Sequence, residues 1–182
     1  MPPKTHHTAV VAIPPLEVWE PIQALRRQHD RNVHRWMPHI TLLYPFLPQT
    51  SFDTALPALL AVGHRLAPMA LTFTTVRAFS HARGNATLWL APEPPAPLVT
   101  LQAALQAAFP DYNEQARFHS GFTPHLSIGQ TRSPAERQQL LQNLRAAWQP
   151  LQCTLHAVAL IWRTADGPFQ VAHNIPLSGH SA

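Results

Sequence analysis

The sequence contains the stretch PHITL at residues 38–42 and, 86 residues later, the stretch PHLSI at residues 124–128. Both follow one pattern of proline, histidine, aliphatic, hydroxyl and aliphatic residues, and both stand in runs that favour a β-strand. Because successive side chains of a strand point to opposite faces, each copy places its imidazole and its hydroxyl on one face. Two such strands side by side would gather two imidazoles and two hydroxyls, a set that can carry out acid–base chemistry on a phosphate without a metal.

The repetition of this pattern is not expected by chance. The composition of the chain predicts about 0.03 copies in a random sequence of this length. Each copy alone has a structural alternative, because a histidine at the start of a buried strand is often an ordinary core side chain. Two matched copies favour the functional interpretation, and the residues that carry it are His39, Thr41, His125 and Ser127.

The length and charge of the chain limit its class. Its 182 residues suit one domain, or two small lobes that share a cleft. The formal net charge is +4, and Lys4 is the only lysine among the 13 lysine and arginine residues; all the others are arginines. Arginine makes forked contacts to phosphate, so this balance suits an anionic ligand, although a GC-rich coding sequence produces the same bias.

No metal or cofactor is predicted. The chain has 12 histidines, but none stands in an HExxH motif or a comparable ligand spacing. Cys153 is the single cysteine, which excludes an internal disulfide, and its alternating strand indicates a core thiol. No stretch approaches about 18 consecutive apolar residues, and the N-terminus has no long apolar segment. We therefore expect a soluble, cytoplasmic monomer that does not associate with membranes.

Hydrophobic periodicity divides the chain into helices and strands. Apolar or alternating runs predict strands over residues 8–13, 39–44, 69–79, 86–91, 123–129, 151–163 and 168–175. Helical spacing predicts helices over residues 16–28, 51–66, 98–109 and 134–148. The buried stripe of the first helix is expected to comprise Leu16, Trp19, Ile22 and Leu25. Ser51 and Ser133 are the expected N-caps of the second and fourth helices, and Glu136 completes a capping box with Ser133.

The two halves of the chain follow the same order: strand, helix, polar segment, motif strand, helix and strand. Ser51 and Ser133 lie 82 residues apart, and so do the strands that begin near residues 69 and 151. We therefore predict an internal duplication within one α+β domain. It would form two pseudo-symmetric lobes of mainly antiparallel sheet, with helices outside and a central cleft; a single connected sheet without this symmetry is the alternative. The predicted boundaries are 1–182 for the domain, 8–79 and 86–163 for the repeats, and 168–175 for the final strand.

The paired motifs resemble the signature of the two-histidine phosphoesterases. This superfamily includes the 2′-5′ RNA ligase-like proteins and the 2′,3′-cyclic nucleotide phosphodiesterases. The proline before each histidine, the aliphatic strand after it and the spacing of the copies all fit, and the resemblance covers most of the chain through the repeat. The second copy has Ser127 where threonine is common in the family, but both residues supply a hydroxyl.

The resemblance implies a metal-independent phosphodiesterase that hydrolyses 2′,3′-cyclic phosphate or 2′-5′ linkages of nucleotides or RNA ends. The chemistry of the residues agrees, because an imidazole with a pKa near 6.5 can serve as base or as acid at neutral pH. Thr41 and Ser127 are expected to donate hydrogen bonds to the non-bridging phosphate oxygens. The sequence does not tell which of His39 and His125 is the acid.

Residues beside the motifs are candidates for binding the substrate. Phe122 and Tyr44 could stack on a nucleobase, although burial in the core is the alternative for both. Arg35 and Arg132 could steer the phosphate, with a solvated surface position as the alternative. Six further residues are interpreted as bystanders or packing residues: His34, His119, Trp36, Trp89, Trp148 and Trp162.

Other functions stay open at this point. A non-catalytic protein that binds nucleotides or RNA ends would keep the cleft without turnover, and ligation by reversal of the same chemistry would make the chain an RNA 2′-5′ ligase. A metal-dependent hydrolase is the least supported, because ligand spacing is absent and carboxylates are scarce. In the leading case, the expected partner is a nucleotide or RNA terminus with a cyclic phosphate.

Overall fold

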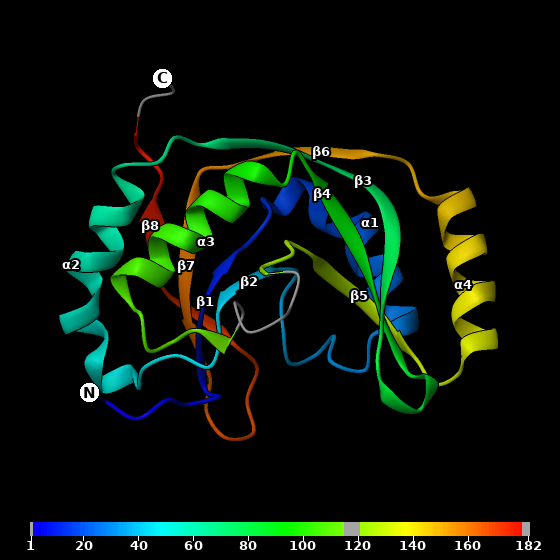
Figure 1. Ribbon diagram of the computed structural model, residues 1–182, viewed down its shortest axis with the longest axis horizontal. Coiled ribbons are helices and arrows are strands. Elements are labelled where there is room, and N and C mark those ends of the chain that lie inside the picture. The colour runs from blue at the N-terminus through cyan, green and yellow to red at the C-terminus, as the bar shows by residue number, and fades with distance from the viewer. Residues whose placement is uncertain (1, 115–120, 180–182) are drawn as a thin grey trace.

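The computed structural model describes residues 2–114 and 121–179, and it has the predicted α+β composition (Figure 1). The strands are β1 (Thr8–Ala12), β2 (Ile40–Leu43), β3 (Met69–Ser80), β4 (Ala86–Glu93), β5 (Leu126–Thr131), β6 (Leu151–Leu155), β7 (Ala157–Trp162) and β8 (Gln170–Pro176). The α-helices are α1 (Trp19–His29), α2 (Phe52–Gly63), α3 (Ala96–Ala108) and α4 (Pro134–Ala147). Short 3₁₀ turns cover Leu16–Val18, Gln49–Ser51 and Ala82–Gly84.

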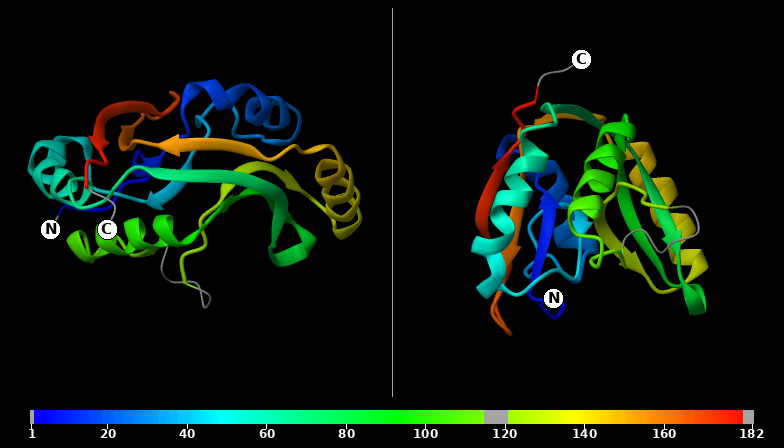
Figure 2. Two further views of the ribbon diagram at one scale, coloured as in Figure 1. Left: turned by 90° about the horizontal axis from the view of Figure 1, so that it is seen from above. Right: turned by 60° about the vertical axis from the view of Figure 1, so that its left-hand side comes forward.

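The strands form one antiparallel sheet in the order β6-β3-β4-β5-β2-β1-β7-β8. The sequence predicts a sheet in each lobe, whereas the structure joins both sides through the motif strands β2 and β5. These strands pair where Ile40 lies opposite Leu126. The sheet is strongly curled, and its two arms are β6-β3-β4-β5 on one side of the β2–β5 pair and β2-β1-β7-β8 on the other (Figure 2).

The arrangement is alike on the two sides of the β2–β5 pair. Strand β1 lies next to β2, as β4 lies next to β5. Strands β3 and β6 pair with each other, and Leu71 lies opposite Cys153, which is 82 residues further along the chain. Equivalent positions of the predicted repeat therefore lie opposite each other, as a local two-fold axis between β3 and β6 would place them. That a duplication produced this arrangement stays a prediction.

Each half of the chain contributes a strand to the other side of the sheet. Strand β3 comes from the first half but pairs with β4 and β6, and β7 comes from the second half but pairs with β1. The sequence predicts one strand over residues 151–163. It divides at His156, because there the chain stops pairing with β3 and begins to pair with β8 and then with β1.

The helices support the motif strands across the two halves. Helix α1 packs on β5 and α3 packs on β2, so each helix supports the motif strand of the other half. Helix α2 contacts α3 and β8, and α4 packs on β3 at the opposite end of the molecule (Figure 1). In the described ranges 2–114 and 121–179, no helix is long and apolar enough to cross a membrane.

Strand β1 is buried on both faces and separates two hydrophobic clusters. Val10 belongs to the main core, whereas Val11 belongs to a smaller cluster in which Phe169 is buried and Trp36 partly buried. Cys153, predicted to be a core thiol, packs against the main core but is only partly buried. The smaller cluster lies beside the first motif and therefore bears on the site.

Two local predictions at helix starts are wrong for the same physical reason. A 3₁₀ turn precedes α2, so Ser51 has φ −104° and ψ 6° rather than the extended backbone of an N-cap, and its side chain makes no capping bond. Leu16 also lies in a 3₁₀ turn, with about three residues per turn instead of about 3.6, and leaves the predicted stripe. Leu16 is 73% exposed, whereas Ile22 is fully buried.

The start of α4 follows the sequence prediction. The Ser133 hydroxyl accepts a hydrogen bond from the Glu136 backbone N–H at 3.2 Å. The Glu136 carboxylate in turn accepts one from the backbone N–H of Arg132, one residue before the cap, at 2.7 Å. This reciprocal capping fixes the point where β5 ends and α4 begins.

Candidate active site

The two motif strands bring the four predicted side chains to one face of the sheet. Ile40 and Leu126 lie opposite each other and point into the core. The residues directly before and after them therefore point to the opposite face of the sheet, where the Cβ atoms of directly opposed residues lie about 5 Å apart. The motif side chains on that face are all partly exposed. Continuing the register by one residue sets each motif histidine opposite the hydroxyl residue of the other strand: His39 opposite Ser127, and His125 opposite Thr41.

His39 is held by a backbone carbonyl and by an aromatic stack. Its Nδ1 lies 2.7 Å from the carbonyl oxygen of Met37. Because a carbonyl only accepts, Nδ1 carries the proton, and Nε2 is the proton acceptor of the neutral ring. The ring stacks on Trp36 with 4.5 Å between centroids, and Trp36 stacks on Phe169 at 3.7 Å. Phe169 precedes β8, so the C-terminal part of the chain helps to position the first motif.

His125 has the same backbone contact in a different aromatic setting. Its Nδ1 lies 2.8 Å from the carbonyl oxygen of Thr123, so Nε2 is again the acceptor of the neutral ring. Phe79 meets the imidazole edge to face, with 4.9 Å between centroids and 89° between planes. Phe79 itself stacks on Trp89 at 4.7 Å. Each motif histidine therefore has one nitrogen fixed by the carbonyl two residues before it.

A buried ion pair lies beside the first motif. The Arg26 Nη2 of α1 lies 2.9 Å from the Asp30 Oδ2, and the two side chains are 2% and 3% exposed. Arg26 also donates to the carbonyl oxygen of Trp36 at 2.9 Å, and Asp30 accepts from Gln130 of β5 at 3.0 Å. The pair thus connects α1 to the residue that stacks on His39 and to the second motif strand.

Burial lowers the pKa of both motif histidines, because a buried imidazole resists becoming charged. The pKa of His39 falls to about 4; the Met37 carbonyl opposes this shift, and the Arg26 guanidinium adds to it. For His125 the Thr123 carbonyl likewise opposes the lowering of the pKa by burial. Both rings are therefore neutral at pH 7 when no anion is bound.

The low pKa of His39 predicts a pH dependence of stability. Between pH 6.5 and about 4 the unfolded chain binds a proton that folded His39 does not, so the folded state loses stability as the pH falls. Between pH 7 and 4.5, we expect the unfolding free energy of the wild type to fall by about 2 kcal/mol relative to a His39→Gln variant, measured by urea unfolding. His34→Gln, at an exposed position, is the control. A constant difference between wild type and His39→Gln would contradict the prediction.

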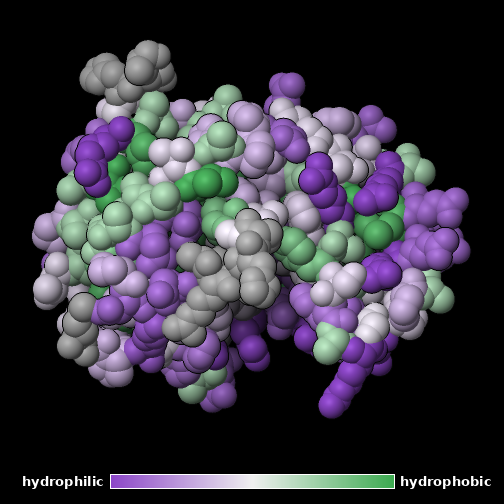
Figure 3. Space-filling view, viewed as in Figure 1, coloured by the Kyte–Doolittle hydropathy of each residue, from purple (hydrophilic) through white to green (hydrophobic). Residues whose placement is uncertain are grey.

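A cavity of about 480 Å³ opens beside the second motif. Its walls come from β5, from the segment before β5 and from the tip of the β3–β4 hairpin, and they include Phe79, His81, Thr87, Phe122, His125 and Ser127. Neither His39 nor Thr41 lines it. The surface on this side of the molecule is notched between its two arms, with hydrophilic side chains along the notch (Figure 3).

The predicted aromatic contacts are divided between this cavity and the core. Phe122 lines the cavity. Tyr44 instead packs with the smaller hydrophobic cluster, edge to face with Trp36 at 5.4 Å. Of the two, Phe122 is thus the one placed where a ligand could contact it.

The predicted arginines lie outside the cavity lining. Arg35 is exposed, and its carbonyl oxygen accepts a hydrogen bond from the Phe169 backbone N–H at 2.8 Å. Arg132 is exposed at the end of β5, roughly 16 Å along the strand from Ser127. His119 lies outside the described residues. Within the described part of the chain, no three histidine, cysteine or acidic side chains gather in a group that could hold a metal.

The aromatic supports of the two histidines are residues of the candidate site that sequence reasoning missed. Trp36 and Trp89 are interpreted from sequence as packing residues, yet Trp36 stacks on His39 and Trp89 meets His125 edge-on at 5.9 Å. Trp36 has a local signal, since it stands three residues before the first motif histidine. Phe79 and Phe169 have none, because distant strands bring them to the motifs.

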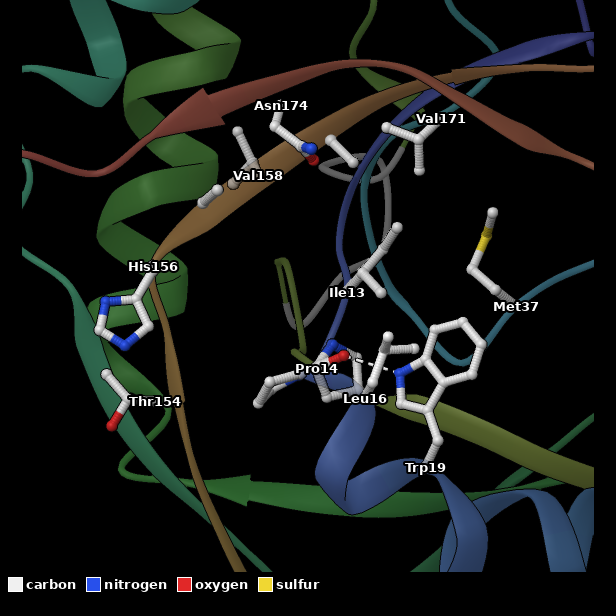
Figure 4. A pocket seen from close by; sticks show the side chains of 13 residues that line it. Ile13, Pro14, Leu16, Trp19, Met37, Thr154, His156, Val158, Val171 and Asn174 are labelled. Atoms are coloured by element: carbon white, nitrogen blue, oxygen red, sulfur yellow. Dashed lines mark hydrogen bonds between the residues drawn. The ribbon is translucent and has the colours of Figure 1, made fainter.

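A second hollow of about 540 Å³ lies apart from the four motif side chains, none of which lines it (Figure 4). It lies between the segment after β1 and strands β7 and β8, and its lining is mostly apolar. At one wall, the Trp19 indole N–H donates to the carbonyl oxygen of Pro14 at 2.7 Å. The exposed Leu16 and Val171 also line it. Met37, whose carbonyl oxygen holds His39, also lines this hollow and is the link between it and the candidate site.

Comparison with known proteins identifies the family. The chain is 28% identical over 137 residues to a Bacillus cereus protein named "Putative phosphoesterase", covering 75% of this chain and 76% of that protein. Its fold is similar to that of E. coli LigT complexed with ATP (TM-score 0.62, 19% identity, 95% and 98% of the two chains covered). It is also similar to that of TT0787 of Thermus thermophilus (TM-score 0.60, 20% identity, 96% and 100% covered). The family model of the 2′-5′ RNA ligase superfamily matches residues 14–167, which include both histidine motifs, and the chain therefore belongs to this superfamily.

Proposed function

We propose that this chain is a metal-independent phosphodiesterase that hydrolyses 2′,3′-cyclic phosphate or 2′-5′ linkages of nucleotides or RNA ends. The observation that carries the proposal is the meeting of two carbonyl-anchored imidazoles, one from each half of the chain, at the β2–β5 pair. Both histidine residues are partly exposed, so a ligand can reach them. Membership of the 2′-5′ RNA ligase superfamily supports the same reaction class.

Hydrolysis of a cyclic phosphate needs a base that takes a proton from water and an acid that protonates the leaving ribose oxygen. Two imidazoles on opposite sides of the phosphorus suit this in-line displacement, and such assistance contributes about 10²- to 10⁴-fold in rate. A bound phosphate anion favours the imidazolium and thereby offsets the effect of burial on the ring that holds the proton. Thr41 and Ser127 would donate hydrogen bonds to the non-bridging oxygens and stabilise their growing charge.

The ligands of structurally similar proteins support a nucleotide as the substrate class. E. coli LigT has been solved in complexes with ATP, 3′-AMP, NADP+ and phosphate. The cavity of about 480 Å³ beside His125 is within the range of small-molecule sites. We therefore assign a nucleotide or an RNA terminus as the ligand of this chain.

The proposed activity is tested with purified protein and a 2′,3′-cyclic nucleotide in the presence of EDTA. We expect a single monophosphate isomer, because in-line attack from one fixed direction expels one particular ribose oxygen. Loss of turnover on addition of the chelator would contradict the metal-independent reaction. Binding without turnover of any phosphodiester would identify a nucleotide-binding protein, and joining of a cyclic-phosphate end to a 5′-hydroxyl end would identify a ligase.

A further inference from the structure

We propose that the nucleoside of the substrate lies on the His125 side of the phosphate, in the cavity beneath the β3–β4 hairpin, so that His125 protonates the leaving ribose oxygen while His39 activates the water. This inference rests on the proposed phosphodiesterase function. It assigns the two roles that the symmetry of the motifs leaves open.

The space around the motifs is not symmetric, although the motifs themselves are. The cavity of about 480 Å³ is lined by His125 and Ser127 and by neither His39 nor Thr41. On the other side, the face of the His39 ring is covered by Trp36, which is itself backed by Phe169. The bulky part of a nucleotide therefore has room beside the second motif.

The walls of the cavity have the chemistry of a nucleoside site. Phe122 offers an aromatic side chain on which a base can stack. At the hairpin, the His81 Nε2 and the Thr87 hydroxyl are 2.9 Å apart and both residues line the cavity, so they can exchange hydrogen bonds with the edge of a base. A small number of polar groups in a partly aromatic pocket is typical of small-molecule sites.

The position of the nucleoside decides which histidine is the acid. In an in-line displacement, the oxygen of water forms its bond to phosphorus on the side opposite the bond that breaks. The ribose carries the leaving oxygen, so the acid stands on the nucleoside side and the base on the water side. His39 Nε2 takes the proton from water, the electron pair of the broken phosphorus–oxygen bond stays on the ribose oxygen, and His125 Nε2 gives that oxygen a proton.

The low pKa of His39 agrees with its proposed role as the base. Burial holds the pKa of His39 at about 4; the Arg26 guanidinium adds to this shift, and the Asp30 carboxylate opposes it. The ring is therefore neutral at pH 7, as a base must be. For His125, burial lowers the pKa and the Thr123 carbonyl opposes this shift. A bound anionic phosphate favours the imidazolium and so offsets the effect of burial on the ring that carries the proton.

An analogue of the cyclic nucleotide with sulfur in place of the leaving ribose oxygen tests the assignment. The monophosphate isomer formed by the wild type identifies which oxygen to replace. A thiolate leaves without protonation far more readily than an alkoxide. We expect the loss of about 10²- to 10⁴-fold in His125→Ala on the natural substrate to shrink to less than about 10-fold on the analogue, whereas His39→Ala loses activity on both substrates.

The other outcomes are equally informative. Rescue of His39→Ala, of both variants or of neither overturns the assignment while hydrolysis by the wild type stands. A wild type that hydrolyses no cyclic nucleotide contradicts the proposed function itself. Thermal melting of His39→Ala separates a lost base from a lost fold, and His39→Gln gives a second variant of similar polarity.

The cavity variant Phe122→Ala tests where the nucleoside lies. We expect the KM for the cyclic nucleotide to rise about 10-fold or more, as when one base-stacking contact is removed, with a smaller change in kcat. Leu16→Ala, an exposed apolar residue in the other hollow, is the matched control and should leave the KM unchanged. An unchanged KM in Phe122→Ala would place the nucleoside elsewhere and overturn the inference.

Discussion

We expect His39→Ala and His125→Ala each to lower the kcat for a cyclic nucleotide by about 10²- to 10⁴-fold, the contribution typical of general acid–base catalysis. The reason is that each ring offers one nitrogen for proton transfer while the other is bound to a backbone carbonyl. Because both histidine residues are partly exposed and lie outside the two hydrophobic clusters, we expect the free energy of unfolding to change by less than about 2 kcal/mol in either variant.

Steady-state kinetics and thermal melting of the same protein samples check both parts of this expectation. His34→Ala removes an exposed imidazole near the first motif and should keep full activity. Unchanged turnover in either motif variant would end the two-histidine mechanism. A large fall in melting temperature would instead indicate that the imidazoles serve mainly to complete the core.

The largest effect on stability is expected for Asp30→Ala. This change leaves the Arg26 guanidinium, which is 2% exposed, without the carboxylate that neutralises it. Removal of one partner from a buried ion pair typically costs about 3–5 kcal/mol, because a buried charge is left uncompensated. Urea unfolding at neutral pH measures the loss.

Glu20→Ala is the matched control, because it breaks the exposed ion pair of Glu20 with Arg27. An exposed pair contributes about 0–1 kcal/mol, so this variant should remain close to the wild type. The double change Arg26→Met with Asp30→Leu removes both buried charges and should recover most of the stability lost in Asp30→Ala. An equal loss of unfolding free energy in Asp30→Ala and Glu20→Ala would show that the buried Arg26–Asp30 pair contributes no more to stability than an exposed pair.

The placement of the four motif residues on one face could be predicted because their arrangement is local. In each motif the alternation of a strand places histidine and hydroxyl on one face, whatever the rest of the chain does. The aromatic supports could not be predicted, since Phe79 and Phe169 meet the histidines only after distant segments come together. The same holds for the burial of the Arg26–Asp30 pair, which looks like an ordinary surface pair at helical spacing in the sequence.

The order and type of the elements could also be predicted, because hydrophobic periodicity reports which faces are buried. The errors occur where a 3₁₀ turn changes the phase of that periodicity, at Leu16 and at Ser51. The joining of the two sides into one sheet rests on the pairing at Ile40 and Leu126, which local patterns do not encode. The division of the predicted strand at His156 likewise follows from a change of partner strand.

The exchange of β3 and β7 between the two sides has a consequence for any half-length version of this chain. A polypeptide with a single motif would lack both the strand that completes its own lobe and the second imidazole. A second copy of that polypeptide, joined in the same manner, would supply the two missing parts at once. In this architecture, the assembly step that completes the sheet of each lobe also brings the two motif imidazoles together.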